Sequence, residues 1–379
     1  MTSRERMAAA QRCATPDRVP VMCQLALGHY FLHAGGDAVA IWHDTTAFAD
    51  ALVTLAARYR FDGILVNLPG RDSRWRTYVA DIHETPEAQV VVWLDGSITK
   101  VPRDDNPHVC LPDGTPKPLP SFADIDPDSL YYVEPHDLSG VTASTFFPPW
   151  HSDTLRLVRT RCSDISVHGE VFSPFSQLIE LVGVSEAMFA LRRDAGKVIA
   201  CLEALSRGTV ELMNSHARTG ADAVLISSAF AGGGFISPGD YRRFVLPAER
   251  SVITAFKRAH PDVPVYTHTC GLLGDRLELL EETGTGGIDT LDPPPLGNVD
   301  LADAKRRVGR RLFLKGNVDP VNTVLRGTPA QCRDDARRRL EMAMEGGGYI
   351  LSTACSVPPH APPENILALT ATVEEFGQY

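Results

Sequence analysis

The stretch "VPVYTHTCG" (263–271) decides the fold, because it is an apolar, β-branched and aromatic run that ends in a polar turn with glycine. Runs of this kind recur along the chain, and each is followed by a stretch with helical spacing. We count eight of them, at 18–27, 62–70, 164–172, 221–230, 263–271, 285–293, 311–320 and 347–356. Eight strands alternating with helices are typical of a (β/α)8 barrel. The sequence therefore predicts an α/β TIM barrel in which residues 1–379 form a single domain.

Helical patterns fill the spaces between these runs. They lie at 45–59, 185–218, 238–259, 272–282, 300–308, 328–345 and 363–377. Two of them begin with a hydroxyl residue followed by proline, at Ser237-Pro238 and Thr328-Pro329. A capping hydroxyl followed by proline in the first turn favours a helix start at both places.

Residues 88–135 interrupt the alternation. "QVVVWLDGSITKV" (89–101) has two β-rich arms around Asp95-Gly96, which predicts a hairpin. The stretch 102–127 that follows is rich in proline and reads as loop. We interpret 88–135 as an insertion after the second strand that packs on the barrel mouth.

Composition narrows the class of protein. A formal net charge of −10 and a pI near 5.6 disfavour a nucleic-acid partner, because phosphate binding requires a basic face. The first residues lack the apolar stretch of a secretory signal, and no window approaches the roughly 18 apolar residues of a membrane span. Eight cysteines without paired spacing indicate reduced thiols. We expect a cytoplasmic protein that binds neither nucleic acid nor membrane.

The same opening stretch carries a candidate metal site. Side chains at i and i+2 of a strand share one face, so His268 and Cys270 point the same way at the carboxyl end of their run. Cys355 occupies the matching place on the eighth run. The carboxyl ends of barrel strands meet at the active-site face. Two thiolates and one imidazole suit zinc (Zn²⁺), and three protein ligands leave the fourth position open, as catalytic zinc requires.

Two carboxylates follow neighbouring runs. Asp292 and Asp319 lie at the ends of the sixth and seventh runs. Asp292 is a candidate to orient a zinc ligand or to occupy the open position when substrate is absent. Asp319 has the alternative of capping a turn before Pro320. The glycine-rich "AGGGF" (231–235) lacks the lysine of a phosphate loop, so we interpret it as a mobile loop.

At this point the chain resembles the uroporphyrinogen decarboxylase superfamily over most of its length. The resemblance lies in "SRERMAAAQRCATPDRVPV" (3–21), "ADAVLISSAFAGGGFISPGDYRRFVLP" (221–247), "LKGNVDP" (314–320) and "PPENI" (362–366). It implies a (β/α)8 barrel, in agreement with the strand count. The arginine-rich loop with which the decarboxylases hold their substrate is missing from "CQLALGHYFLHAGGD" (23–37), and "STACSVPP" (352–359) replaces their late glycine-histidine stretch.

A second branch of that superfamily fits better. Its members are zinc-dependent thiol alkyltransferases, namely methylcobalamin:coenzyme M methyltransferases and epoxyalkane:coenzyme M transferases. Their motif is His-x-Cys followed much later by a single Cys, which His268, Cys270 and Cys355 match. The resemblance implies zinc ligation by these three residues and alkyl transfer to a thiol, with coenzyme M as the expected acceptor. An epoxide is slightly preferred as the alkyl donor, because no corrinoid-binding module is visible; a separate corrinoid protein would remove that argument.

The remaining candidates serve this chemistry. The sulfonate of coenzyme M requires arginine or a helix N-terminus, and Arg71, Arg74 and Arg76 in "GRDSRWR" (70–76) follow the second strand. An exposed basic loop beside Asp72 is the alternative reading. Epoxide opening also requires a proton donor or an ordered water. The residues considered for that role are His29, Tyr30, His168 and His360.

Two other functions stay open at this stage. One is metal-free porphyrinogen decarboxylation, which the missing arginine loop disfavours. The other is a zinc-binding or corrinoid-binding partner protein that positions the substrate of another subunit; it predicts bound metal without turnover by this chain alone.

Overall fold

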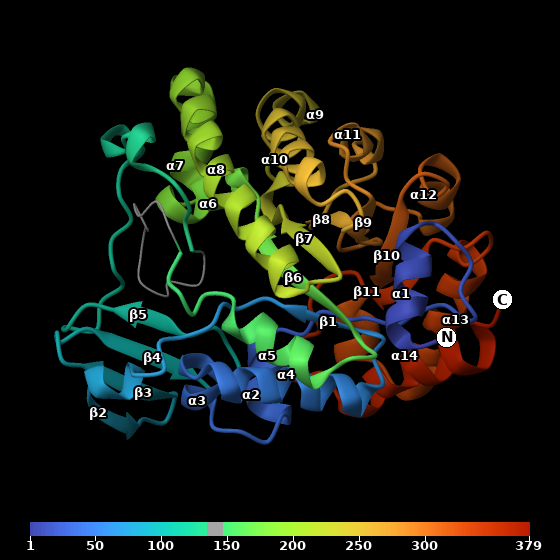
Figure 1. Cartoon of the computed structure of the whole chain (residues 1–379), viewed down its shortest axis with the longest axis horizontal. Coiled ribbons are helices and arrows are strands. Elements are labelled where there is room, and N and C mark those ends of the chain that lie inside the picture. Colours follow the sequence, from blue (N-terminus) through green and yellow to red (C-terminus); the bar gives the residue numbers. More distant parts are fainter. Residues whose placement is uncertain (135–146) are drawn as a thin grey trace.

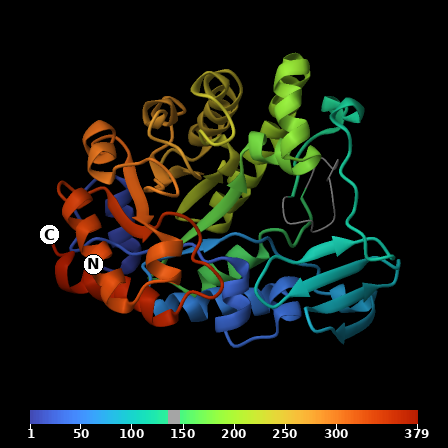
Figure 2. The same ribbon diagram turned by 180° about the vertical axis from the view of Figure 1, so that it is seen from behind.

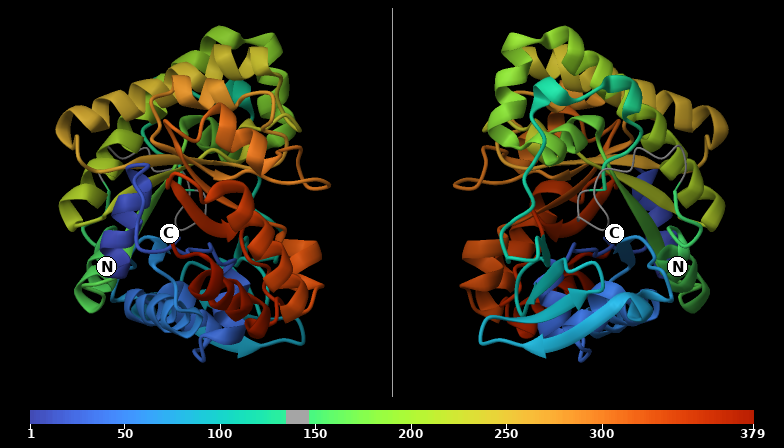
Figure 3. Two further views of the ribbon diagram at one scale, coloured as in Figure 1. Left: turned by 90° about the vertical axis from the view of Figure 1, so that its right-hand side faces the viewer. Right: turned by 90° about the vertical axis from the view of Figure 1, so that its left-hand side faces the viewer.

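Seven parallel strands form one curled sheet in the order β1, β6, β7, β8, β9, β10 and β11 (Figure 3). The computed structural model describes residues 1–134 and 147–379. The strands are β1 (Gly63–Val66), β6 (Ser166–Phe172), β7 (Ala223–Ser227), β8 (Val265–Thr269), β9 (Gly287–Thr290), β10 (Phe313–Val318) and β11 (Tyr349–Thr353). Each lies within one of the expected runs, so seven of the eight predicted strands are confirmed.

Helices surround this sheet (Figures 1 and 2). Their bounds are α1 (Ser3–Gln11), α2 (Leu27–His33), α3 (Ala38–His43), α4 (Thr45–Tyr59), α5 (Asp153–Arg161), α6 (Pro174–Val182), α7 (Val184–Arg193), α8 (Ala195–Thr219), α9 (Pro238–Asp240), α10 (Leu246–Ala259), α11 (Leu277–Glu282), α12 (Leu301–Arg307), α13 (Pro329–Ala343) and α14 (Pro363–Phe376). Among the residues described, none of these helices has the length and apolar character needed to cross a membrane.

Two expected helices are interrupted for local reasons. The pattern at 185–218 divides into α7 and α8, because the Asp194 side chain accepts the Lys197 N–H and begins a new helix. The pattern at 238–259 contains a π-helical turn over Tyr241–Val245. Pro247 follows that turn and has no N–H for an α-helical bond, which explains the irregularity. The predicted helix start at Thr328-Pro329 is confirmed, and Thr328 forms a capping box with Gln331 at the start of α13.

The predicted first strand at 18–27 is wrong. The segment makes only isolated bridges, from Arg18 to Gln378, from Val21 to Leu351 and from Leu25 to Val357. Pro20 within the run cannot donate a ladder hydrogen bond, although its carbonyl accepts the Leu351 N–H at 2.9 Å. The described residues therefore form a seven-stranded curled sheet, with an irregular extended segment where the eighth strand was expected.

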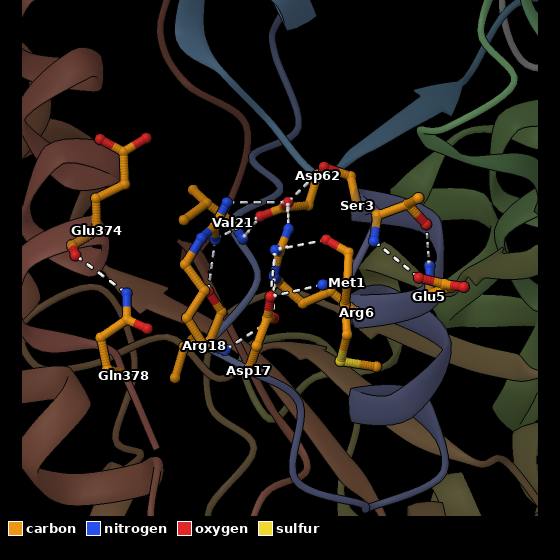
Figure 4. A network of polar contacts seen from close by, with 12 residues as sticks. Met1, Ser3, Glu5, Arg6, Asp17, Arg18, Val21, Asp62, Glu374 and Gln378 are labelled. Carbon is orange, nitrogen blue, oxygen red and sulfur yellow. Dashed lines mark hydrogen bonds and ion pairs between the residues drawn. The ribbon is translucent and has the colours of Figure 1, made fainter.

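Ion pairs hold this irregular segment beside β1 (Figure 4). The fully buried Asp62 directly precedes β1 and accepts hydrogen bonds from Arg6 Nη1 (2.7 Å), Arg18 Nη1 (2.8 Å) and the Val21 N–H (2.8 Å). Ser3 of α1 donates to the same carboxylate at 2.7 Å. One carboxylate thus connects α1, the segment after it and β1, and it does so without a regular strand ladder.

A separate antiparallel sheet lies between β1 and β6 in the sequence and beyond α2 and α3 in space (Figure 1). It contains β2 (Val79–Glu84), β3 (Ala88–Trp93), β4 (Ile98–Pro102) and β5 (His108–Cys110). The predicted hairpin is confirmed, since the Trp93 N–H bonds to the Ser97 carbonyl at 2.9 Å. The sheet starts at Val79, before the boundary expected at 88, and residue 135 of the expected insertion lies outside the described residues. That the segment is an insertion on the barrel mouth stays a prediction.

Candidate metal centre

Three ligand atoms converge where two strands end. His268 belongs to β8, Cys270 follows it, and Cys355 follows β11, 85 positions later. His268 Nε2 lies 3.2 Å from Cys270 Sγ, and Cys270 Sγ lies 3.8 Å from Cys355 Sγ. All the ligand atoms lie within 4.8 Å of one another. His268 is buried and both cysteines are half-buried, so the cysteines keep partial contact with solvent. The sequence predicted this convergence.

A buried ion pair orients His268. Its Nδ1 lies 3.3 Å from Asp289 Oδ2, and Lys315 Nζ donates to Asp289 Oδ1 at 2.8 Å. Asp289 faces His268 because β8 and β9 pair these two residues in register. Burial acts to raise the pKa of Asp289, but the charge of Lys315 and the bond to His268 outweigh it and lower that pKa to about 2. An ionised carboxylate on Nδ1 leaves Nε2 as the ligand atom.

The two thiols differ in their tendency to ionise. The hydrogen bond between them, opposed by burial and aided by the imidazole of His268, lowers the pKa of Cys355 well below its ordinary value. A thiolate is the form that binds a metal. The lowered pKa favours the thiolate form of Cys355, and metal binding would ionise both cysteines.

A strained turn places Asp292 next to these ligands. Thr290 and Leu291 have φ of 78° and 57°, which non-glycine residues rarely adopt. Asn317 holds the turn through a 2.7 Å bond to the Leu291 carbonyl. Asp292 then accepts the Gly271 N–H at 2.5 Å, and burial raises its pKa to about 6. Asp292 thus fixes the backbone directly after Cys270. Its expected contact with a metal stays a prediction.

The structure assigns Asp319 to its alternative role. Its carboxylate accepts the N–H groups of Val321 and Asn322 at 2.8 Å and so caps the turn that begins at Pro320. The "AGGGF" segment packs on the loop after β8, where the Gly233 N–H bonds to the Leu272 carbonyl at 2.8 Å.

Among the described residues, the expected proton donors make their contacts with residues other than the three ligands. His29 has both ring nitrogens in hydrogen-bonding contact, with Tyr59 and with the Pro358 carbonyl. His168 sits near the start of β6 and contacts Gln11 of α1 and the Tyr266 hydroxyl. Two further candidates also have contacts with other residues. They are Tyr30, which packs edge-on against Phe48, and His360, which pairs with Asp104 in solvent at 2.7 Å.

Only one of the three expected arginines points inward. Arg74 is exposed and pairs with Asp72 at 3.2 Å, and Arg76 is exposed over the Trp75 ring. For Arg74 and Arg76 the structure therefore shows the alternative, an exposed basic loop beside Asp72. Arg71 lies over the Trp42 ring and bonds to the Trp42 carbonyl at 2.8 Å. Its Nη2 is buried and has no hydrogen-bond partner among the described residues.

Sequence reasoning missed three charged residues inside strands: Asp289, Lys315 and Glu170. A charged residue in an otherwise apolar strand was the available signal, since such residues are almost never buried without a partner. Glu170 lies on β6, and burial raises its pKa to about 7. It lines an interior pocket together with Glu134, His151 and His216, which are distant in sequence.

A family model described as "Uroporphyrinogen decarboxylase (URO-D)" matches residues 129–376, which is more than half of the chain. The chain belongs to the URO-D family. The matched region contains β6 to β11 and all three members of the candidate metal centre.

Curated relatives of this URO-D family member carry the name uroporphyrinogen decarboxylase. The protein of Chlorobium phaeovibrioides is 27% identical over 267 residues, which cover 68% of this chain and 70% of the relative. That of Paraburkholderia phytofirmans is 33% identical over 179 residues, covering 47% of this chain and 46% of the relative. Among solved structures, a methyltransferase from Methanosarcina mazei matches with a TM-score of 0.74 and 19% identity, covering 99% of both chains. This likeness shows a shared fold.

Proposed function

We propose that this protein catalyses zinc-dependent alkyl transfer to a thiol. The observation that carries the proposal is the meeting of His268, Cys270 and Cys355, with all ligand atoms within 4.8 Å, at the carboxyl ends of β8 and β11. Among the described residues, this is the only such cluster of three or more possible ligands. A three-ligand set at the active-site face suits a catalytic metal better than a structural one.

The donor set fits zinc. One imidazole and two thiolates are zinc ligands, and Asp289 on the far side of His268 provides the carboxylate that zinc-bound histidines commonly have. When bound, zinc would lower the pKa of a thiol at its open position, so that a thiolate exists at neutral pH. The protein's part is to hold the ligands, exclude water and orient the two substrates.

Asp289→Asn is expected to lower the affinity for zinc by about 10- to 100-fold, because the amide no longer fixes the His268 tautomer. Competition against a chromogenic chelator measures this affinity. Asp303→Asn on α12, whose carboxylate is 40% exposed, is the matched control and should match the unmodified protein. Equal affinity of Asp289→Asn and the control would contradict the orienting role.

Of the three expected arginines, Arg71 is proposed to bind the anionic end of the thiol. Its unpartnered, buried Nη2 can donate to a sulfonate, which supports coenzyme M as the acceptor. Loss of one hydrogen bond to a charged group costs about 1.5–3 kcal/mol, so Arg71→Gln is expected to raise the KM for coenzyme M at least about tenfold. The KM for 2-mercaptoethanol, which has a hydroxyl in place of the sulfonate, should not change. The exposed Arg74→Gln is the control. An equal rise in KM for both thiols would contradict this assignment.

The alkyl donor is proposed to be an epoxide. Among the described residues, the two sheets and their helices are the only elements, and no separate corrinoid-binding module accompanies them. Methyl transfer from a methylcorrinoid is the alternative, and the shared fold with a methyltransferase is compatible with it. Purified protein incubated with coenzyme M and either epoxypropane or methylcobalamin separates the two, since each donor gives a different thioether.

Porphyrinogen decarboxylation is the second candidate function, because the curated relatives carry that name. Two features disfavour it. The chain lacks arginine in 23–37, and it brings together the thiols of Cys270 and Cys355, which a metal-free decarboxylase does not need. Chromatography of the products from uroporphyrinogen tests it directly. Stepwise loss of carboxyl groups would replace our proposal, and unchanged uroporphyrinogen would remove this candidate.

A further inference from the structure

Two of the candidate zinc ligands are cysteines whose sulfurs contact each other. Cys270 Sγ lies 3.8 Å from Cys355 Sγ, although 85 positions separate the two residues in the sequence. The structure describes all eight cysteines, and among them this is the only contact between two cysteine sulfurs. Two thiols in contact can form a disulfide bond within the chain, which a thiol without such a neighbour cannot do.

The backbone around the pair leaves room for this bond. A disulfide has an S–S distance of about 2.05 Å, so the two sulfurs must approach each other from 3.8 Å. Cys270 directly follows Thr269, the last residue of β8, and Cys355 comes two positions after Thr353, the last residue of β11. Neither cysteine belongs to a strand ladder. Side-chain rotation with a small shift of these two loops therefore brings the sulfurs together without disturbing the sheet.

The surroundings favour access by a small oxidant. Cys270 and Cys355 are half-buried, whereas most of the other cysteines are buried. Gly271 follows Cys270 with a φ of 80°, and a side chain at this position would meet no atom within 4 Å. The space beside Cys270 is therefore open. Cys13 is also half-buried, but no other cysteine sulfur contacts it among the described residues.

Zinc binding and disulfide formation exclude each other at this pair. Zinc is held by thiolates, and the sulfurs of a disulfide are not thiolates. Oxidation of Cys270 and Cys355 would leave His268 as the only remaining member of the ligand set. The same two sulfurs thus have a reduced state that suits a metal and an oxidised state that does not.

We propose that Cys270 and Cys355 form a reversible disulfide with a peroxide as the oxidant, and that this bond prevents zinc from binding. One thiol sulfur attacks the peroxide, so an S–O bond forms, the O–O bond breaks and water leaves. The other thiol sulfur attacks the resulting sulfenic acid, so an S–S bond forms, the S–O bond breaks and a second water leaves. The sulfurs lose two electrons, which reduce the peroxide, and both thiol protons end in water.

This disulfide would regulate the proposed function, and only its effect on activity rests on that function. Zinc-dependent alkyl transfer would stop when the pair is oxidised and resume after reduction and reloading with zinc. In the zinc-loaded protein the two protons for water come from solvent, and zinc is released. Formation of the bond itself depends on the two thiols alone, so it can be tested in metal-free protein.

Peptide mass spectrometry of the full-length, metal-free protein tests the bond. Reduced protein is freed of reductant and treated with an equimolar amount of hydrogen peroxide, its remaining thiols are blocked with N-ethylmaleimide, and it is digested without reduction. We expect a cross-linked peptide pair that joins Cys270 to Cys355 and is lighter than the two thiol peptides by two hydrogen atoms. Dithiothreitol should separate the pair. The thiols that can be blocked after unfolding should fall by two from the eight of the reduced chain.

Two variants and an unfolded sample are the controls. Cys13→Ser should give the same cross-link, because Cys13 is half-buried and lies outside the metal centre. Cys355→Ser leaves Cys270 without a thiol partner, so its sulfenic acid should persist and react with dimedone. Protein unfolded in urea should give a mixture of cysteine pairings with the same peroxide, which shows that the fold selects the pair.

The zinc-loaded protein gives a second readout. A chromogenic chelator is expected to detect about one zinc released for each disulfide formed, because the metal and the disulfide require the same sulfurs. Dithiothreitol followed by zinc should restore the bound metal. Cross-linked protein that still holds its zinc would contradict the exclusion of zinc by the disulfide.

The outcomes separate this inference from the proposed function. If the reduced protein binds no zinc, the proposed function fails and the effect on zinc with it, while the cross-link in metal-free protein still decides whether the disulfide forms. If zinc binds but peroxide gives no link between Cys270 and Cys355, the disulfide is overturned and the proposed function stands. Other pairings in the folded protein, or oxidation of both sulfurs to sulfinic acid, overturn the disulfide as well.

Discussion

Replacing Cys355 by serine is expected to lower the affinity for zinc by more than about 100-fold and to abolish alkyl transfer. This loss is larger than the one expected for Asp289→Asn, because Asp289 contacts a ligand and Cys355 is itself a ligand. Serine has nearly the size of cysteine, but its hydroxyl does not ionise at neutral pH and is a poor zinc ligand. Cys355 is also the thiol whose pKa is lowered by its hydrogen bond to Cys270 and by His268, which favours the thiolate that a metal needs, and serine cannot supply it.

Chelator competition measures the affinity in the Cys355→Ser variant, and formation of the thioether measures the activity. Cys13→Ser is the control, because Cys13 is half-buried and lies outside the metal centre. Melting curves of the metal-free proteins should agree between variant and control. Full activity in Cys355→Ser would contradict the proposed function, since transfer would then not need the third ligand.

Replacing Asp62 by alanine is expected to lower the free energy of unfolding by about 3–5 kcal/mol, the usual cost of removing one partner from a buried ion pair. Asp62 is fully buried, and the change leaves Arg6 and Arg18 without their shared acceptor. Arg6 keeps a second carboxylate, Asp17, at 2.6 Å, so the lower end of this range is the more consistent value.

Urea unfolding of the metal-free protein measures this effect. Glu374→Ala is the control, because it breaks a surface pair with Arg60 in which both side chains are more than a third exposed. Such pairs contribute about 1 kcal/mol or less. Equal stability of Asp62→Ala and the control would show that the irregular segment before β1 is held by its apolar contacts alone.

Most of the fold could be predicted from the sequence, because seven apolar runs are bounded by turns and followed by helices. The exception at 18–27 has a physical reason. Its composition favours a strand, but Pro20 removes a donor, and the segment is held by side-chain bonds to Asp62 that depend on the tertiary structure. Periodicity carries no information on such a bond across more than 40 positions.

The convergence of the three metal-centre residues could also be predicted, because it follows from the regular alternation of strands and helices. His268 and Cys270 share a strand end, and barrel geometry places the end of every strand at one face, which brings in Cys355. Asp289 and Lys315 could not be placed without the register between β8, β9 and β10. The arginines of 70–76 follow β1 as expected, but the direction of each side chain depends on Trp42, Asp72 and Trp75, which no local pattern reveals.

The most direct test of the central claim is the metal content of the unmodified protein, purified under reducing conditions without added zinc and measured by plasma mass spectrometry. The account predicts about one zinc per chain, removed by a strong chelator together with the ability to alkylate coenzyme M and regained with it on adding zinc. Protein that is folded and reduced, yet holds no zinc even after reconstitution, would contradict the account. Metal-free porphyrinogen decarboxylation would then be the favoured function.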